Sequence, residues 1–305
     1  MQDINVDTWE EFEEQLKVRQ RSVGSGGSPL LFRGQGDSTW PLKTTLERSG
    51  GDGMRLRQYY QVISAITPEI ETLTGAEWDV PQYPEIERSM RVYETLSSGH
   101  CPAYSYLVYL RHHGFPTPLL DWTRSPYIAA YFAFSSALAR PTSAKFICPS
   151  CGQNAGAKGD AVLICGRCYN ADREVIRIMG RDEERVSIYV FLEKPEGIKG
   201  WSGREPRICR QGEYIRTHRR HVLQQADYSI CILFDAEWRF SSHEEVFALG
   251  KSNQDVLWKY NLPLKERTKV LRKLDDYNLN AFSLFASEES LMATMALRKL
   301  DFQDE

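Results

Sequence analysis

The sequence has no apolar run long enough to cross a membrane, and its N-terminus lacks the apolar stretch that a signal peptide carries. It also lacks a strong net charge, because 38 Lys and Arg oppose 41 Asp and Glu to give −3. No overall positive field therefore attracts nucleic acid, and any such contact must be local. These absences predict a cytoplasmic protein that does not enter a membrane.

Cysteine is sparse, but four of the seven cysteines form two Cys-x-x-Cys pairs. Two such pairs about a dozen residues apart supply the four thiolates of a tetrahedral structural zinc site. The alternative is four unrelated buried cysteines. Four protein ligands leave no open position for water or substrate, so the expected zinc is structural and not catalytic. The predicted ligands are Cys148, Cys151, Cys165 and Cys168.

Apolar spacing predicts one α+β domain over residues 1–305, with an inserted zinc ribbon over 145–169. The ribbon is expected to have short strands at 145–147 and 161–164. Other strands are predicted at 29–33, 186–192, 228–234 and 281–285. Helices are predicted at 8–19, 54–73, 85–97, 103–113, 125–134 and 263–277, with a last one from about 288.

The helix predicted at 125–134 begins with Ser125 as N-cap and Pro126 in its first turn. It is apolar on nearly every face, which is typical of a buried helix. Tyr127 in this helix is a candidate for stacking on a planar ligand, and packing in the core is the alternative.

The first candidate segment for chemistry is Phe32–Gln35, at the end of an apolar strand. Arg33 followed by Gly34 offers a fixed guanidinium and close approach of the backbone, which suits phosphate or ribose oxygens. The alternative is that Arg33 pairs with a structural carboxylate.

The second segment runs from His112 to Thr123. It places His112 and His113 before a turn, and Asp121, Trp122 and Thr123 at a strand-to-helix corner. Polar residues at such a corner face the rim of a cleft more often than the core. Either histidine could instead be a structural residue, and Asp121 could be a turn or cap residue.

The third segment, 219–227, leads into the strand predicted at 228–234. Asp227, two residues after Gln225, lies immediately before the start of that strand. A carboxylate there could bind ribose hydroxyls or stabilise a cationic transition state. The alternative is a turn contact at the start of the strand.

These segments resemble the FRG domain family. Its [FY]RG motif stands here as Phe32-Arg33-Gly34, and its longer signature as His113-Gly114, Pro116-Thr117, Leu119–Thr123, Ser125-Pro126, Ala130 and Phe132-Ala133. The resemblance extends over residues 28–295, apart from the predicted zinc insertion.

The order of the segments also resembles the ADP-ribosyltransferase fold, a split β-sheet flanked by helices. That resemblance implies that Arg33, Gly34 and Gln35 bind NAD together with His113, Asp121, Trp122, Thr123 and Tyr127. It also implies catalytic roles for Arg33, Gln225 and Asp227. Aspartate stands at 227 where the fold has glutamate. The absence of a Rossmann Gly-rich signature and of a P-loop fits this fold, since it needs neither.

The resemblance implies an NAD-dependent mono-ADP-ribosyltransferase, with NAD as substrate. The alternatives are a non-catalytic FRG module that binds a nucleotide or partner protein, and a nuclease that uses His112, His113 and Asp121. The acceptor would be nucleic acid, RNA first, or protein. A local basic stretch favours nucleic acid, with a solvated charged surface as the alternative interpretation of that stretch. The basic residues are Arg204, Arg207, Arg210, Arg216, Arg219 and Arg220.

Such an enzyme would be a bacterial toxin or antiphage effector held by an inhibitory, antitoxin-type partner.

Overall fold

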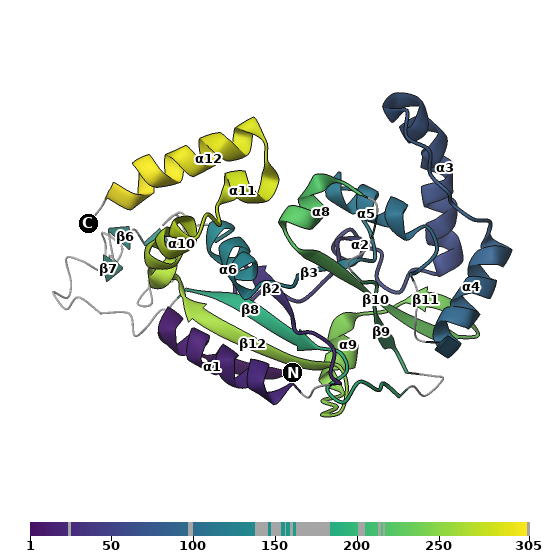
Figure 1. The fold of residues 1–305 in the computed structure, drawn as a ribbon, viewed down its shortest axis with the longest axis horizontal. Coiled ribbons are helices and arrows are strands. Elements are labelled where there is room, and N and C mark those ends of the chain that lie inside the picture. Colours follow the sequence, from purple (N-terminus) through teal and green to yellow (C-terminus); the bar gives the residue numbers. More distant parts are fainter. Residues whose placement is uncertain are drawn as a thin grey trace.

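The structure is a computed structural model, and it describes residues 1–23, 26–96, 100–137, 146–147, 154–155, 157–158, 161–162, 184–200, 205–212, 215 and 217–303. An eight-stranded mixed sheet forms its centre, with helices packed on both faces (Figure 1). The strand order is β1-β12-β8-β2-β3-β10-β11, and β9 also pairs with β10. The strands are β1 (Gln2–Asn5), β2 (Leu31–Gln35), β3 (Leu120–Thr123), β8 (Arg185–Leu192), β9 (Arg207–Arg210), β10 (Ala226–Asp235), β11 (Glu237–Phe240) and β12 (Val256–Pro263).

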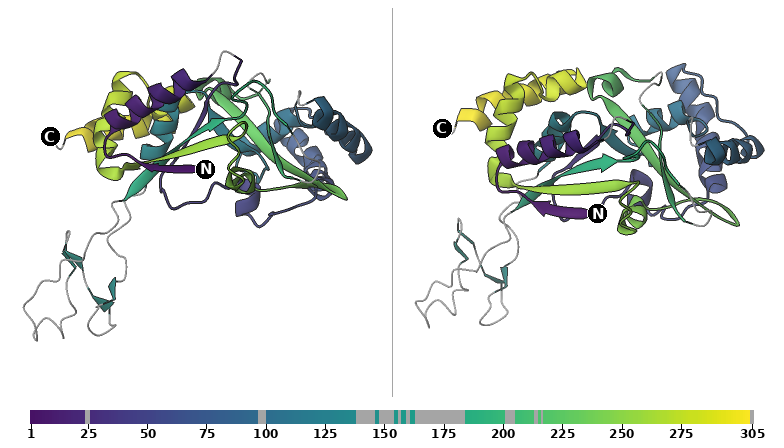
Figure 2. Two further views of the ribbon diagram at one scale, coloured as in Figure 1. Left: turned by 90° about the horizontal axis from the view of Figure 1, so that it is seen from below. Right: turned by 60° about the horizontal axis from the view of Figure 1, so that its bottom comes forward.

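One half of the sheet consists of β1, β12, β8 and β2, covered on one face by three helices. Figure 2 shows β1 on the outer side of β12, where the two strands run parallel. The helices are α1 (Trp9–Ser22), α6 (Pro126–Ser135) and α10 (Arg267–Asp276). Their apolar side chains and those of the strands form one buried cluster. The predicted caps are present, because Thr8 accepts from the Glu11 amide and Ser125 from the Ile128 amide.

The other half consists of β3, β10, β9 and β11, and different helices cover the same face. A second buried cluster joins β10 and β11 to α3 (Leu56–Thr74), α4 (Tyr83–Leu96) and α5 (Tyr104–His112). The short helix α8 (Arg219–Leu223) leads directly into β10. The predicted helices and strands of this half are therefore confirmed, with ends shifted by a few residues.

The opposite face of the sheet is continuous across both halves. A third cluster there contains Leu31 of β2, Trp122 of β3, Phe191 of β8 and Cys231 of β10. The helix α9 (His243–Ala248) packs on it through Val246 and Phe247. The small helix α2 (Thr45–Arg48) lies in the connection from β2 to α3.

The two halves meet at a single residue pair. Strands β2 and β3 pair only through Phe32 and Thr123, whereas β2 pairs with β8 over five residues from Leu31 to Gln35. Beyond Phe32 the strands separate, so the sheet is split at its middle. This split lies between the two helix-covered clusters and makes room for a pocket on that face.

The C-terminal segment contains one error of prediction. Residues 281–285 form the helix α11 (Ala281–Phe285) and not a strand. The Asn280 side-chain oxygen accepts a hydrogen bond from the Ser283 amide, and the Ser283 hydroxyl accepts one from the Asn280 amide. This reciprocal pair is a capping box, which initiates a helix. Ala281 and Leu284, three residues apart, are both buried, as one face of a helix requires. The last helix, α12 (Glu288–Lys299), begins where the sequence predicts.

The four predicted zinc ligands lie outside the residues that the structure describes. Within the insertion, β4 (Phe146–Ile147) pairs with β5 (Asn154–Ala155), and β6 (Ala157–Lys158) pairs with β7 (Ala161–Val162). Among the described residues no helix is both long and apolar enough to span a bilayer.

Candidate functional site

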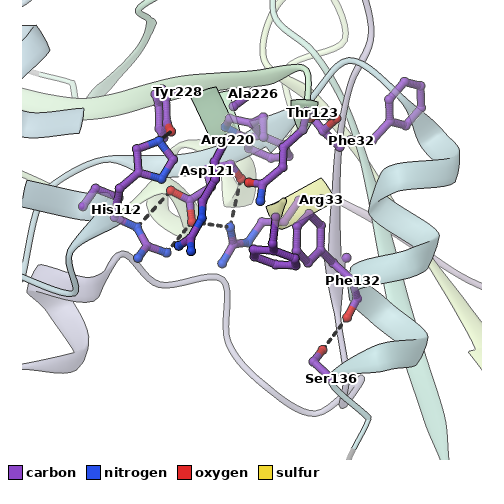
Figure 3. A pocket seen from close by; sticks show the side chains of 15 residues that line it. Phe32, Arg33, His112, Asp121, Thr123, Phe132, Ser136, Arg220, Ala226 and Tyr228 are labelled. Carbon is purple, nitrogen blue, oxygen red and sulfur yellow. Dashed lines mark hydrogen bonds and ion pairs between the residues drawn. The ribbon is translucent and has the colours of Figure 1, made fainter. Parts of the chain in front are cut away.

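A pocket of about 340 Å³ lies at the split between β2 and β3 (Figure 3). Its polar side chains come from β2, α5, β3, α8 and β10, and its aromatic walls from β2, α6 and α11. Its volume is near the lower end of the range for small-molecule sites, enough for a mononucleotide-sized group. The lining residues that carry polar or charged groups are Arg33, Arg111, His112, Asp121, Thr123, Ser136, Arg220, Gln224 and Tyr228, beside Phe32, Phe132 and Phe285.

At the centre of the pocket, Asp121 binds two guanidinium groups. Arg111 donates its Nε to Asp121 Oδ1 at 2.9 Å and a terminal nitrogen to Oδ2, which is a bidentate pair. Arg33 donates to the Asp121 main-chain carbonyl at 2.9 Å and lies 3.5 Å from Oδ2. The Arg33 side chain thereby fills the gap where β2 and β3 separate. Its Nε is buried and has no hydrogen-bond partner among the described residues.

Burial and the neighbouring charges shift the pKa values of this cluster in opposite directions. Burial alone would raise the pKa of Asp121, but the charges of Arg111 and Arg33 hold that pKa below its ordinary value. Burial lowers the pKa of Arg33, and attraction to Asp121 counteracts it. Attraction to Asp121 raises the pKa of Arg111. The carboxylate is therefore ionised, and both arginines are charged at neutral pH.

The wall made by α8 and α11 supplies a third guanidinium. The Arg220 guanidinium lies over the Phe285 ring, 5.5 Å from its centroid, and its buried Nε has no partner among the described residues. Gln224 Nε2 donates to the Leu284 carbonyl at 3.3 Å, which links α8 to α11. With Phe132 of α6, Phe285 provides flat apolar surface on which a planar ring could stack.

A histidine and a tyrosine form the wall opposite α6. His112 Nε2 lies 3.2 Å from the Tyr228 hydroxyl, and the His221 ring stacks on Tyr228 with centroids 5.8 Å apart. Burial lowers the pKa of His112 to about 4, so its ring is neutral at pH 7. Burial also raises the pKa of Tyr228, which keeps its hydroxyl protonated. This wall is thus polar but uncharged.

The two residues predicted to follow the catalytic Gln-x-Glu pattern do not line this pocket. Neighbouring residues of a strand point to opposite faces, and Ala226 and Tyr228 are the residues of β10 that line it. Asp227 is fully buried and accepts from Arg210 Nε at 2.8 Å. Gln225 has a left-handed backbone, with φ of 46°, and an exposed side chain. The glutamine that lines the pocket is Gln224.

Of the predicted ligand-binding residues, Arg33, Gly34, Asp121, Trp122 and Thr123 line the pocket. The Trp122 indole packs in the opposite core, where it stacks on Phe191 and donates to Ser229 Oγ at 2.8 Å. Thr123 Oγ1 donates to the Gln224 carbonyl at 2.7 Å and so ties β3 to the end of α8.

Glycine at 34 has a packing role. A Cβ there would lie 1.9 Å from the Ala129 carbonyl oxygen, so only glycine lets α6 lie this close to β2.

Three other predicted residues lie elsewhere. Gln35 is buried and hydrogen-bonds to Tyr189 and to the Pro41 carbonyl. His113 is exposed at the end of α5, and Tyr127 packs between Trp9 and Tyr277. None of them lines the pocket, although the neighbouring His112 does.

Of the basic residues predicted as a nucleic-acid contact, the four that the structure describes do not form one continuous exposed surface. Arg204 and Arg216 lie outside the described residues. Arg207 is buried, and Arg210 is held by Asp227. Arg219, which is exposed, and Arg220 remain near the pocket on α8.

Comparison with known proteins supports one of the two resemblances. The family model of the FRG domain matches residues 28–141, which confirms the expected resemblance to that family over this part of the chain. The matched segment contains β2, α5, β3 and α6 and so includes Arg33, Arg111 and Asp121. Residues 142–295, where the resemblance was also expected, lie beyond it. Searches of curated proteins and of solved structures found no match to the chain.

Proposed function

We propose that the pocket at the split of the sheet holds one half of an NAD molecule and that the protein is a mono-ADP-ribosyltransferase. The observation that carries the proposal is the meeting of Arg33, Arg111 and Arg220 around one carboxylate, Asp121, beside the aromatic walls. A split sheet with an arginine on the strand beside the split also fits the resemblance to the ADP-ribosyltransferase fold.

The charge of the pocket suits the diphosphate of a dinucleotide. Three guanidinium groups oppose one carboxylate, and His112 is neutral. The remaining positive charge can bind an anionic group, and guanidinium groups bind phosphate oxygens bidentately. Phe132 and Phe285 offer stacking surface for the nicotinamide or adenine ring.

Asp121 takes the role that the sequence resemblance gave to Asp227. In ADP-ribosyl transfer the bond from ribose C1′ to the nicotinamide nitrogen breaks, and its electron pair leaves with nicotinamide. A nucleophile of the acceptor then forms the new bond to C1′ and releases its proton. The ribose passes through a cationic state, and Asp121 is the carboxylate of the pocket that can stabilise it.

The decisive experiment is release of nicotinamide from labelled NAD, with cellular RNA, DNA and protein supplied in turn as acceptors. Release that depends on one acceptor class, together with label transfer to it, is the expected result. RNA is the acceptor to test first. No release with any acceptor, in protein shown to be folded, would contradict the enzymatic proposal.

A second candidate function, binding of a nucleotide without turnover, is favoured by the pairing of Asp121. Two guanidinium groups already neutralise this carboxylate, so less of its charge can reach a substrate. NAD binding by the parent protein, with no nicotinamide release in the presence of any acceptor, would support the binding module. The nuclease alternative retains His112 and Asp121 in the pocket but not His113.

The cellular role extends the same proposal. We propose that the enzyme acts as a cytoplasmic toxin or antiphage effector, and that an inhibitory protein partner protects the host cell from it. Co-purification of a partner that suppresses nicotinamide release tests this role. Harmless expression of active enzyme with no such partner would contradict it.

A further inference from the structure

A second pocket, of about 190 Å³, lies between α2 and the connection from β11 to α9. It shares no lining residue with the pocket at the split of the sheet. The turn at 51–53 closes one side, and Gly51 approaches Leu46 so closely that a Cβ would lie 2.5 Å from it. The turn and α2 therefore pack closely on this side of the pocket.

Acidic side chains predominate in its lining. Three carboxylates, those of Glu47, Asp52 and Glu245, oppose the single guanidinium of Arg239. Lys43 lies 3.8 Å from Asp52, and Arg239 donates to Asp235 at 3.0 Å. Within the part of the chain that the structure describes, Glu47 and Glu245 have no Lys or Arg at ion-pair distance.

Glu47 supplies an independent observation that points to a ligand. Its side chain is only 9% exposed. Its Oε2 accepts from the Thr44 amide at 2.7 Å, but its Oε1 is buried with no hydrogen-bond partner among the described residues. A buried carboxylate oxygen without a partner is unfavourable, and a bound donor would relieve this cost.

The lining indicates which kind of cation fits. The described residues contain no group of three or more His, Cys, Asp or Glu that could hold a metal ion. Leu46, Pro118 and Leu233 form an apolar wall along which an aliphatic stem can lie. The Ser241 hydroxyl donates to Glu245 Oε2 at 2.8 Å, and the Ser242 hydroxyl accepts from the Glu244 amide at the start of α9.

We propose that this pocket binds an alkyl cation: a guanidinium or ammonium group on a short aliphatic stem. The cationic head lies between Glu47 and Glu245, and the stem lies along the apolar wall. The ligand is either a free amine or the arginine or lysine side chain of a peptide, since both present the same chemistry.

Ligand-observed NMR and calorimetry with n-butylguanidinium test the proposal, and n-butylurea is its neutral isostere. We expect the cation to bind at millimolar concentration, and the urea to bind at least about tenfold more weakly. Glu47→Gln and Glu245→Gln should each weaken binding of the cation about tenfold. Glu237→Gln is the matched control, because Glu237 pairs with Arg55 and does not line the pocket.

Two peptides distinguish the sources of the cation. Tighter binding of acetyl-Gly-Arg-Gly-amide than of butylguanidinium, with no binding of its citrulline analogue, would identify a protein side chain as the ligand. Binding of the small cation alone would identify a free amine.

The glutamine variant at position 47 also needs a measurement of folding. The amide oxygen introduced by Glu47→Gln can still accept from the Thr44 amide, so this variant should melt within a few degrees of the parent protein. Equal binding of butylurea, no binding of the cation, or no effect of either glutamine variant overturns the proposal.

Discussion

Arg111 and Asp121 form a bidentate ion pair in the wall of the main pocket, with Nε and Oδ1 2.9 Å apart. Arg111 lies at the end of α5 and Asp121 on β3, so the pair fixes the helix to the strand beside the split. Asp121 also holds Arg33 across that split through its main-chain carbonyl. Asp121 is thus the point where the two halves of the site are joined electrostatically.

Asp121→Asn should lower nicotinamide release by two to three orders of magnitude, as an about 3–4 kcal/mol loss of transition-state stabilisation implies. NAD binding should persist or tighten, because Arg33 and Arg111 lose the carboxylate that neutralises them. Single-turnover kinetics and calorimetry measure the two effects separately. Near-full turnover by the folded variant would show that Asp121 does not face the ribosyl cation.

Asp227→Asn is the matched substitution outside the pocket. It removes the buried negative charge that pairs with Arg210, so we expect the free energy of unfolding to fall by about 3–5 kcal/mol. Turnover per folded molecule should stay near that of the parent protein. Urea titration and nicotinamide release measure the two quantities. A large loss of turnover at unchanged stability would restore Asp227 as the catalytic carboxylate.

The contrast between these two aspartates shows why the site was only partly predictable from the sequence. The motifs located β2, β3 and the start of β10, and they identified Arg33 and Asp121. Which residues of β10 face the pocket depends on strand register, and a shift of one residue reverses every side chain. The prediction chose Asp227, whereas Tyr228 lines the pocket. Arg111 carried no signal beyond its position in a helix.

The fold was more predictable because its signals are local. Thr8 and Ser125 cap helices where the sequence indicates. The segment 281–285 was predicted as a strand from its apolar residues alone, and the capping box of Asn280 and Ser283 outweighs that preference. The order of strands in the sheet, which is set by contacts distant in the chain, carried no such local signal.

Gly34→Ala should destabilise the protein by about 3 kcal/mol or more, because the new Cβ would lie 1.9 Å from the Ala129 carbonyl oxygen and 2.6 Å from the Ala133 amide nitrogen. The fit of α6 against β2 cannot relax without moving the backbone. Gly26→Ala is the control, since a Cβ there meets nothing within 4 Å. Thermal and urea unfolding of both variants test this. Equal stability of the two would mean that α6 does not pack as closely as the structure shows.

The free energy of unfolding should fall as the pH falls from about 6.5 towards 4. Burial, with further effects from Arg33 and Lys199, lowers the pKa of His243 to about 3 from an ordinary value of 6.5. His243 therefore stays neutral in the folded protein while the unfolded chain takes up a proton, which favours unfolding. One such group contributes a slope of up to about 1.4 kcal/mol per pH unit. His112, with its pKa lowered to about 4, acts in the same direction.

His243→Gln should remove its share of that slope. Glutamine can still hydrogen-bond to Ser229 Oγ, which His243 Nε2 contacts at 2.9 Å. Urea titrations at pH 5, 6 and 7 give the slope for both proteins. An unchanged slope in the variant would show that His243 takes up its proton at the same pH in the folded and unfolded states.

The zinc prediction can be tested by counting thiols, because the three cysteines that the structure describes are all buried. Cys101, Cys209 and Cys231 are buried, and burial raises the pKa of Cys101 and Cys231, so none of the three should react in the folded protein.

Purified protein should contain about one equivalent of zinc, as one four-cysteine site requires. A strong chelator should then release it and expose four reactive thiols, and denaturation should raise the count to the full seven. Cys151→Ser should abolish stoichiometric zinc while the main sheet keeps its cooperative unfolding. Four thiols that react before any chelator is added, in protein without zinc, would show that the two Cys-x-x-Cys pairs do not form a metal site.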